Sequence, residues 1–257
     1  MNMTKVKYEQ SNPAGEPTVI LGSSLGTDRF MWREQVESLP RTWNVITFDL
    51  RGHGASPVGP GTPSIDDFAD DVVAIADDVG VHRFAFCGLS IGGVIGQSLG
   101  ARYPDRVSSL VLASTGLTIL SKQALVERAE RVLDEGMAWI ADVSAPRWFT
   151  ERFRSEHPEI VEAKMDHLRH MAPRGYADAC LALAGFDGHD TAPSISAPTL
   201  ILSGEEDLAT PPEGSAELAS AVPGAVLRSL PACAHLCNVE QPALFTELVQ
   251  RHVEANN

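Results

Sequence analysis

Short apolar runs rich in β-branched residues recur along the chain, and most are bounded by Gly, Pro or Asp. They lie at residues 18–21, 44–48, 83–87, 108–113, 199–203 and 225–230. Uninterrupted apolar runs of this length are typical of strands that are buried on both faces of a parallel sheet. The pattern therefore predicts six strands of a mostly parallel sheet.

Helical patterns separate the predicted strands. In the segment 65–79 one apolar stripe lies opposite the aspartates and consists of Ile65, Phe68, Ala69, Val72 and Val73. The segments 92–102, 213–221 and 241–255 also read as helices. Strands that alternate with helices predict an α/β fold with a doubly wound sheet.

The alternation stops between residues 117 and 192, where no strand-like run occurs. This segment has a helical pattern and contains Trp139, Trp148 and Phe149, and it is punctuated by Pro146, Pro158 and Pro173. We interpret residues 117–192 as a helical lid inserted into an α/β core formed by residues 1–116 and 193–257.

Composition and charge narrow the class of protein. The 257 residues include 44% hydrophobic residues, which is enough for a sizeable core, and the formal net charge is −14. A charge of this sign argues against nucleic acid or an anionic membrane as a partner, and leaves a small molecule as the expected one. An anionic substrate would need a local positive group in the site.

The start of the chain, MNMTKVKYEQ, has no apolar segment of a signal peptide. No apolar run approaches the roughly 20 residues that cross a bilayer. We therefore expect a cytoplasmic enzyme with reduced cysteines.

A GxSxG sequence, Gly88–Gly92, follows the predicted strand 83–87 directly and precedes a helical segment. In this context it is typical of a nucleophile elbow, whose glycines let the backbone turn tightly. We predict Ser90 as the nucleophile. The N–H groups and partial positive charge at the start of the next helix favour an oxyanion.

His235 is the predicted base, because it follows the last predicted strand in a loop at the carboxyl edge of the sheet. The acid should lie between the serine and this histidine, just past a strand end. Asp207 fits, with Glu205 and Glu206 as competing carboxylates that we expect inside the turn. His53, in the run DLRGHG, is expected to fix a loop rather than to take part in catalysis.

The second oxyanion donor should come from the loop after an early strand. That loop is Gly22–Asp28, with the sequence GSSLGTD. The predicted oxyanion hole consists of the backbone N–H groups of Leu25 and Ile91. The alternative for this loop is an ordinary polar turn.

Six runs along the chain carry a family resemblance. They are Gly22–Asp28, Phe48–Ser56, Phe86–Gly93, Arg147–Phe149, Gly204–Pro212 and His235–Pro242. Together they resemble the 3-oxoadipate enol-lactonases of aromatic catabolism over nearly the whole chain. The first and last runs discriminate best, whereas the RGHG and GxSxG sequences are shared by many α/β-hydrolases.

The resemblance implies an α/β-hydrolase fold without a metal or organic cofactor. It also implies a compact substrate, an enol-lactone with one carboxymethyl group, which is opened to 3-oxoadipate. Arg147 is the candidate for binding the carboxylate and Trp148 for packing on the ring. The alternative is a surface arginine beside a core tryptophan, and Arg169 and Arg174 are weaker candidates.

The chain departs from the family pattern in two places. Residues 5–9 offer one strand where the family usually has a longer hairpin. Cys233 and Cys237 flank His235, where we would expect small, acidic or polar residues. These three side chains have no distant partner, so we predict no metal site.

Three other functions fit the same residues. They are another esterase or lactonase of this fold, a cofactor-free perhydrolase of the haloperoxidase type, and a ligand receptor on a hydrolase scaffold. Substrate profiling separates the enzymes, and a covalent serine probe separates an enzyme from a receptor.

Overall fold

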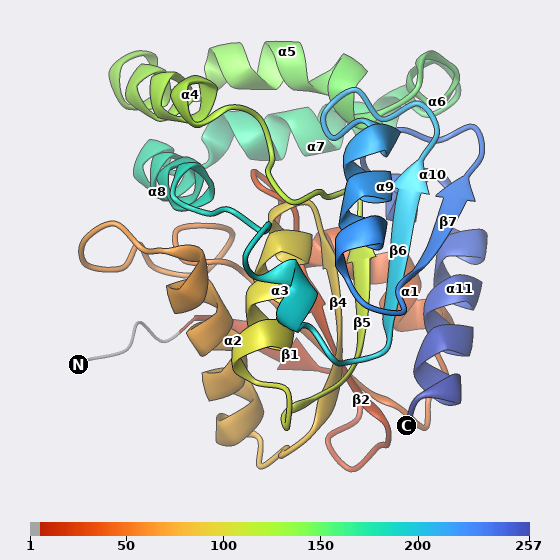
Figure 1. Ribbon diagram of the computed structural model, residues 1–257. Helices are drawn as coiled ribbons and strands as arrows, with labels where there is room; N and C mark the ends of the chain where they lie inside the picture. Colours follow the sequence, from red (N-terminus) through yellow and green to blue (C-terminus); the bar gives the residue numbers. More distant parts are fainter. Residues whose placement is uncertain (1–5) are drawn as a thin grey trace.

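The computed structural model describes residues 6–257, and its centre is a seven-stranded sheet (Figure 1). The strands are β1 (Tyr8–Gln10), β2 (Thr18–Gly22), β3 (Asn44–Phe48), β4 (Phe84–Leu89), β5 (Val107–Ala113), β6 (Thr199–Gly204) and β7 (Val226–Leu230). Their order across the sheet is β1-β3-β2-β4-β5-β6-β7. The pair β1–β3 is antiparallel, and the other described pairs are parallel. The predicted α/β fold is therefore confirmed.

Each of the six apolar runs forms a strand, but β7 is not buried on both faces. Val226, Arg228 and Ser229 are exposed, whereas every residue of β4 and β5 is buried. The reason is position, because β7 is an edge strand with a neighbour on one side only. Of the segment 5–9, Lys5 lies outside the described residues, as does the first half of the stretch 1–10 that we read for a signal peptide.

Helices cover both faces of the sheet (Figure 1). Their bounds are α1 (Arg33–Ser38), α2 (Ile65–Asp78), α3 (Ile91–Arg102), α9 (Pro212–Ala221), α10 (Cys237–Glu240) and α11 (Pro242–Ala255), with 3-10 turns η1 (Arg29–Trp32) and η2 (Ala192–Ser194). Helices α2, α3 and α9 lie on one face, and α1 and α11 on the other. The four helices that the sequence predicts here all form, whereas α1 and α10 are too short to show a periodic pattern.

One aspartate of α2 does not lie on the outer side of the helix, contrary to the sequence interpretation. Asp71 is buried, and both its carboxylate oxygens accept hydrogen bonds from the Arg51 guanidinium, one at 2.8 Å. Burial raises the pKa of Asp71 even though Arg51 opposes this change. The ion pair thus ties α2 to the loop that follows β3.

Between β5 and β6 the chain forms helices α4 (Lys122–Glu135), α5 (Ala138–Trp148), α6 (Glu151–Glu156), α7 (Pro158–His170) and α8 (Pro173–Ala184). They lie over the carboxyl ends of the parallel strands (Figure 1). Pro158 and Pro173 begin α7 and α8, where a missing N–H costs nothing. The division of the chain into a core and a lid at residues 116 and 193 stays a prediction.

Helix α8 is seated directly on the core. A Cβ atom on Gly175 would lie 2.2 Å from the carbonyl oxygen of Gly52, and one on Gly52 would lie 2.4 Å from the Cα of Gly175. Neither position can therefore carry a side chain without moving the backbone. Two glycines let α8 and the loop after β3 approach this closely.

The same loop contains His53, which is completely buried. Its Nδ1 lies 3.1 Å from the carbonyl oxygen of Arg51, which agrees with a role in fixing the loop. Burial lowers the pKa of His53 to about 4. The buried imidazole is therefore neutral in the folded protein at neutral pH.

This burial makes His53 a source of acid sensitivity. As the pH falls below the unfolded pKa of about 6.5, the unfolded chain takes up a proton that the folded protein does not. For a folded pKa of about 4, the free energy of unfolding should drop by about 2 kcal/mol at pH 5. We expect His53→Asn to show a smaller drop between pH 7 and pH 5 in urea unfolding, with the exposed His82→Asn as control. An unchanged drop in His53→Asn would contradict this assignment.

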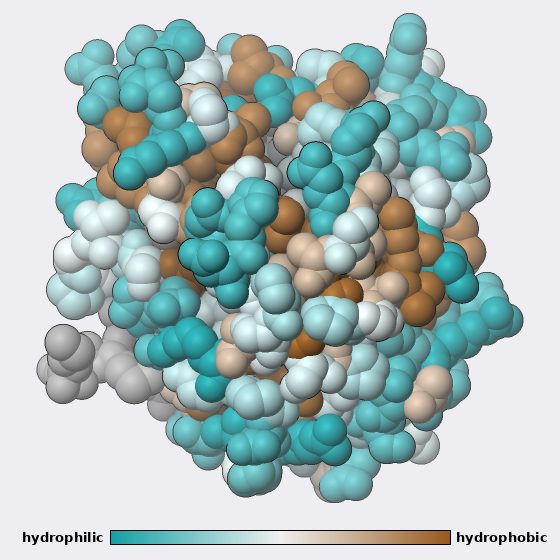
Figure 2. All heavy atoms as spheres, in the orientation of Figure 1, coloured by the Kyte–Doolittle hydropathy of each residue, from teal (hydrophilic) through white to brown (hydrophobic). Residues whose placement is uncertain are grey.

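The visible surface is mostly hydrophilic. On the face that Figure 2 shows, hydrophilic residues predominate, and the hydrophobic ones gather over the upper helices and beside α9 and β7. Leu133, Val143 and Val226 are among the exposed large hydrophobic residues. Within residues 6–257 no helix is long and apolar enough to span a membrane.

Candidate active site

Ser90 lies between the end of β4 and the start of α3 with φ 61° and ψ −117°. A residue with a side chain pays a steric cost in this conformation, and such outliers persist where the surroundings enforce them. The surroundings do so here, because a Cβ atom on Gly88 would lie 2.1 Å from the carbonyl oxygen of Gly92. This geometry is that of a strand–turn–helix elbow with the serine at its tip.

The loop after β2 packs directly against this elbow. A Cβ atom on Gly92 would lie 2.3 Å from the carbonyl oxygen of Gly22. The backbone N–H groups of Leu25 and Ile91 donate to no acceptor among residues 6–257. Both therefore remain available to an external acceptor, as the predicted oxyanion hole requires.

Asp207 and His235 come together from the loops after β6 and β7. The Nδ1 atom of His235 lies 2.9 Å from Oδ2 of Asp207, and both side chains are almost fully buried. Glu205 and Glu206, the competing carboxylates, are exposed. The carboxylate that meets the imidazole is thus the one predicted.

Thr210 completes this pair, and sequence reasoning missed it. Its Oγ1 donates to Oδ2 of Asp207 at 2.7 Å, and its N–H donates to Oδ1 at 2.9 Å. The N–H of Ala209 also donates to Oδ1. Burial acts to raise the pKa of Asp207, but His235 and these hydrogen bonds outweigh it and hold the pKa below its usual value.

Helix α5 holds the loop that carries His235. The N–H of Leu236 donates to the carbonyl oxygen of Trp148 at 3.1 Å. The carboxylate of Glu240 accepts from the N–H of Thr150 at 2.6 Å and from the N–H of Ala234 at 2.9 Å. One carboxylate therefore joins the end of α5 to the residue before His235.

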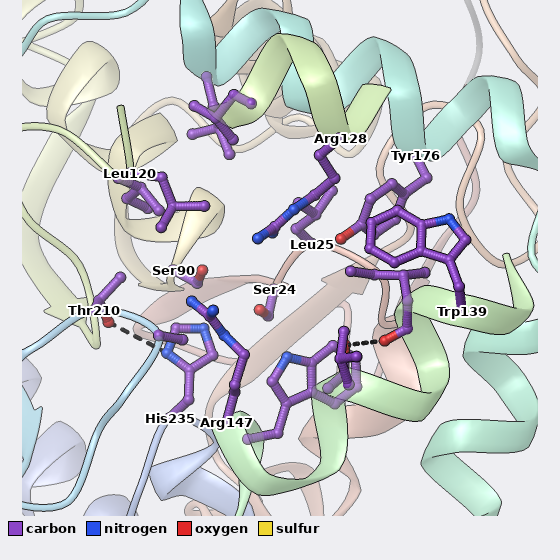
Figure 3. A pocket seen from close by; sticks show the side chains of 18 residues that line it. Ser24, Leu25, Ser90, Leu120, Arg128, Trp139, Arg147, Tyr176, Thr210 and His235 are labelled. Carbon is purple, nitrogen blue, oxygen red and sulfur yellow. Dashed lines mark hydrogen bonds between the residues drawn. The ribbon is translucent and has the colours of Figure 1, made fainter. Parts of the chain in front are cut away.

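Ser90 and His235 open into one cavity of about 260 Å³ beneath helices α4, α5 and α8 (Figure 3). Leu25, Leu120, Ile140 and Trp148 supply apolar parts of its wall. A cavity that combines an apolar wall with convergent polar groups is typical of a small-molecule site.

Two arginines point into this cavity (Figure 3). Arg147 was predicted, and Arg128 on α4 was not. Neither forms an ion pair with a carboxylate of residues 6–257. Burial, together with the charge of Arg128, lowers the pKa of Arg147. The buried hydroxyl of Tyr176 faces the same space, and burial raises its pKa.

The weaker arginine candidates lie elsewhere. Arg169 is paired with Glu162 at 2.6 Å, and Arg174 with Asp178 at 2.7 Å. Neither lines the cavity.

Cys233 and Cys237 are free and completely buried beside His235. Burial raises the pKa of Cys237 to about 12, so its thiol is protonated at neutral pH. The Ser114 hydroxyl lies 3.5 Å from the Cys237 sulfur. Among the described residues, no group of three or more His, Cys, Asp or Glu could hold a metal ion.

Comparisons with known proteins agree with this geometry. Residues 17–242 match the model of the alpha/beta hydrolase fold family. The chain is 36% identical to 3-oxoadipate enol-lactonase 2 of Acinetobacter baylyi over 245 residues, which is 95% of this chain and 91% of that protein.

Solved structures give the same result. The enol-lactonase from Burkholderia xenovorans is 36% identical, with a TM-score of 0.93 and 98% of each chain covered. A thermophilic esterase from Thermogutta terrifontis is 32% identical, with a TM-score of 0.91, and 97% of this chain and 93% of that chain are covered. The chain belongs to the alpha/beta hydrolase fold family, and it is a carboxylic-ester hydrolase that resembles the 3-oxoadipate enol-lactonases.

Proposed function

We propose that this enzyme is a serine hydrolase that opens 3-oxoadipate enol-lactone to 3-oxoadipate through an acyl-enzyme, as a step of aromatic catabolism in the cytoplasm. One observation carries the choice of substrate. Two arginines without carboxylate partners line the same 260 Å³ cavity as Ser90 and His235. A small ester or lactone that carries a carboxylate suits such a cavity.

The first half of the reaction acylates Ser90. With Nδ1 of His235 held by Asp207, Nε2 is left to take the hydroxyl proton as Oγ attacks the lactone carbonyl. The carbonyl π electrons move to oxygen, and the N–H groups of Leu25 and Ile91 stabilise this oxyanion. When the intermediate collapses, the bond from the carbonyl carbon to the ring oxygen breaks, and the leaving oxygen takes the proton from His235, which gives an enol and restores the neutral imidazole.

The second half releases the product. His235 takes a proton from water as the water attacks the acyl carbon, and the same oxyanion hole serves the second intermediate. Collapse returns the proton from His235 to Ser90 and leaves a new carboxylic acid, which ionises in water. The enol tautomerises to the ketone. Of the groups that these steps use, Ser90, His235 and Leu25 line the cavity.

The negative net charge of the protein makes a local positive group necessary for binding an anionic substrate. A net charge of −14 repels an anionic substrate at long range. Arg128 and Arg147 reverse the sign locally, and a guanidinium binds a carboxylate through two parallel hydrogen bonds. The wall of Trp148 and Leu25 accommodates the flat ring between them and Ser90.

Hydrolysis of freshly generated 3-oxoadipate enol-lactone, followed through loss of lactone absorbance, tests this function. Wild-type enzyme should open the lactone faster than an uncharged lactone of the same ring size. If the enol-lactone survives while a simple aryl ester is cleaved, the enzyme is an esterase of different specificity. If peracid forms from acetate and hydrogen peroxide while both esters survive, it is a perhydrolase.

Arg147→Gln and Arg128→Gln should each lower kcat/KM for the carboxylated lactone by about 10- to 100-fold. This range corresponds to the roughly 1.5–3 kcal/mol of a hydrogen bond to a charged group. The value for an uncharged aryl ester should change little. Arg169→Gln is the matched control, because this arginine is paired on the surface with Glu162. Equal losses on charged and uncharged substrates would contradict a role in carboxylate binding.

A further inference from the structure

The loop after β2 contains a second serine that faces the cavity. Ser24 is 1% exposed and lines the same cavity as Ser90 and His235. Figure 3 shows its hydroxyl oxygen directed towards the space in front of Ser90. Its backbone neighbour Leu25 supplies one of the two N–H groups assigned above to the oxyanion hole.

The hydroxyl of Ser24 has no hydrogen-bond partner among the described residues, although the groups around it do. The neighbouring Ser23 hydroxyl donates to the carbonyl oxygen of Asp28 at 3.3 Å. The carbonyl oxygen of Ser24 accepts from the Thr27 hydroxyl at 2.7 Å and from the Thr27 N–H at 3.1 Å. The Ser24 hydroxyl is therefore free to donate to an acceptor bound in the cavity.

The position of Ser24 is fixed relative to the elbow. The Thr27 hydrogen bonds and the contact of the Ser24 N–H with the Met31 sulfur, at 3.3 Å, hold its backbone. The carbonyl oxygen of Ser23 would lie 3.1 Å from a Cβ atom on Gly92, so the loop packs on the first turn of α3. A rigid donor beside the nucleophile costs little reorganisation during the reaction.

We propose that the Ser24 hydroxyl is a third donor of the oxyanion hole and hence a catalytic residue of this site. This inference rests on the serine mechanism proposed above. As Ser90 Oγ bonds to the carbonyl carbon and its proton passes to His235, the carbonyl π electrons become a lone pair on oxygen. Ser24 Oγ–H donates to that oxygen alongside the two N–H groups, and it keeps its own proton throughout.

A hydroxyl differs from the two N–H groups in one useful respect. It rotates about the Cβ–Oγ bond, so it can follow the oxygen as the carbonyl carbon changes from planar to tetrahedral. A donor that binds the developing oxyanion more strongly than the ground-state carbonyl lowers the barrier without tightening substrate binding. The expected signature is therefore a change in kcat rather than in KM.

Steady-state hydrolysis of p-nitrophenyl acetate by Ser24→Ala tests the proposal. We expect kcat to fall about 10- to 100-fold, somewhat less than the loss for a backbone donor, with KM within about twofold of the wild type. Ser24→Gly deletes the same hydroxyl and should give the same kcat. Ser23→Ala is the matched control, because its hydroxyl serves a backbone carbonyl outside the cavity, and it should keep wild-type kcat.

A transition-state analogue gives an independent readout. A trifluoromethyl ketone that forms a hemiketal with Ser90 should bind Ser24→Ala more weakly by the same factor as kcat falls. A merely structural role for Ser24 would change the melting temperature and KM instead. The loss of analogue affinity would then not match the fall in kcat.

The outcomes separate this inference from the function on which it rests. If Ser90→Ala is inactive while Ser24→Ala and Ser24→Gly keep kcat within about twofold of the wild type, the third donor is refuted and the serine mechanism stands. If Ser90→Ala keeps wild-type activity, both the mechanism and the third donor are refuted. A fall in kcat with matched weakening of the analogue supports the donor.

Discussion

Replacing Ser90 with alanine is expected to lower kcat for lactone and aryl esters by about 100,000-fold or more, while the protein stays folded. Ser90 stands at the tip of the strained elbow, and it shares its cavity with the imidazole of His235, which Asp207 holds through Nδ1. Removing the nucleophile of a comparable triad costs this order of magnitude, and the residual rate comes from the oxyanion hole and binding. Single-turnover kinetics with an aryl ester measure the loss of the acylation burst.

A covalent probe gives this prediction its control. A fluorophosphonate should label the wild type at Ser90 and leave Ser90→Ala unlabelled. Ser90→Gly should be equally inactive but more stable than Ser90→Ala by about 1–3 kcal/mol, because glycine relieves the φ of 61°. Substantial turnover by Ser90→Ala would refute the serine mechanism.

Asp207→Asn is expected to lower kcat about 10,000-fold at neutral pH with little effect on KM. The carboxylate accepts from His235 Nδ1 and from the Thr210 hydroxyl. An amide in its place presents N–H donors, and it then favours the imidazole tautomer in which Nε2 carries the proton and cannot act as a base. The loss should be partly recovered at high pH, which a pH–rate profile measures.

The low pKa of Asp207 adds a stability prediction with a defined sign. Because the folded pKa lies below the ordinary value of about 3.9, the carboxylate contributes stability above that pH and loses it as the pH falls through the folded pKa. Asp207→Asn should lack this decline in acid unfolding.

Glu206→Gln, which changes an exposed neighbour, is the control for the assignment of the acid and should keep activity. An inactive Glu206→Gln would mean that the acid was assigned to the wrong carboxylate.

The central strands were predictable because burial on both faces leaves a simple pattern in the chain. β4 and β5 have no exposed residue, so their apolar runs are uninterrupted. The edge position of β7 could not be predicted from its own residues, because an edge strand is defined by having a neighbouring strand on one side only. Asp71 was misplaced for a related reason, since its partner Arg51 lies in another element.

The same limit explains what was missed in the site. Ser90, Asp207 and His235 were predicted because chain order and strand ends restrict their positions, and the structure places His235 Nδ1 2.9 Å from Asp207. Arg128 reads as one of many charges on the amphipathic helix α4, and only the packing of α4 over the cavity turns it inward. Thr210 is likewise unremarkable in a loop until its hydroxyl is seen on Asp207.

The carboxylate of Glu240 has a consequence for recombining such enzymes. Because this carboxylate accepts hydrogen bonds from the N–H groups of both Thr150 and Ala234, it links the helices over the cavity to the loop that carries His235. A chimaera that exchanges residues 117–192 for those of a homologue also exchanges one side of this joint. Transplanted specificity should survive with its turnover only when the donor segment places a backbone N–H within reach of Glu240 at the position of Thr150. The hydrogen bonds of Glu240, and not the shape of the new pocket alone, then determine which exchanges give an active enzyme.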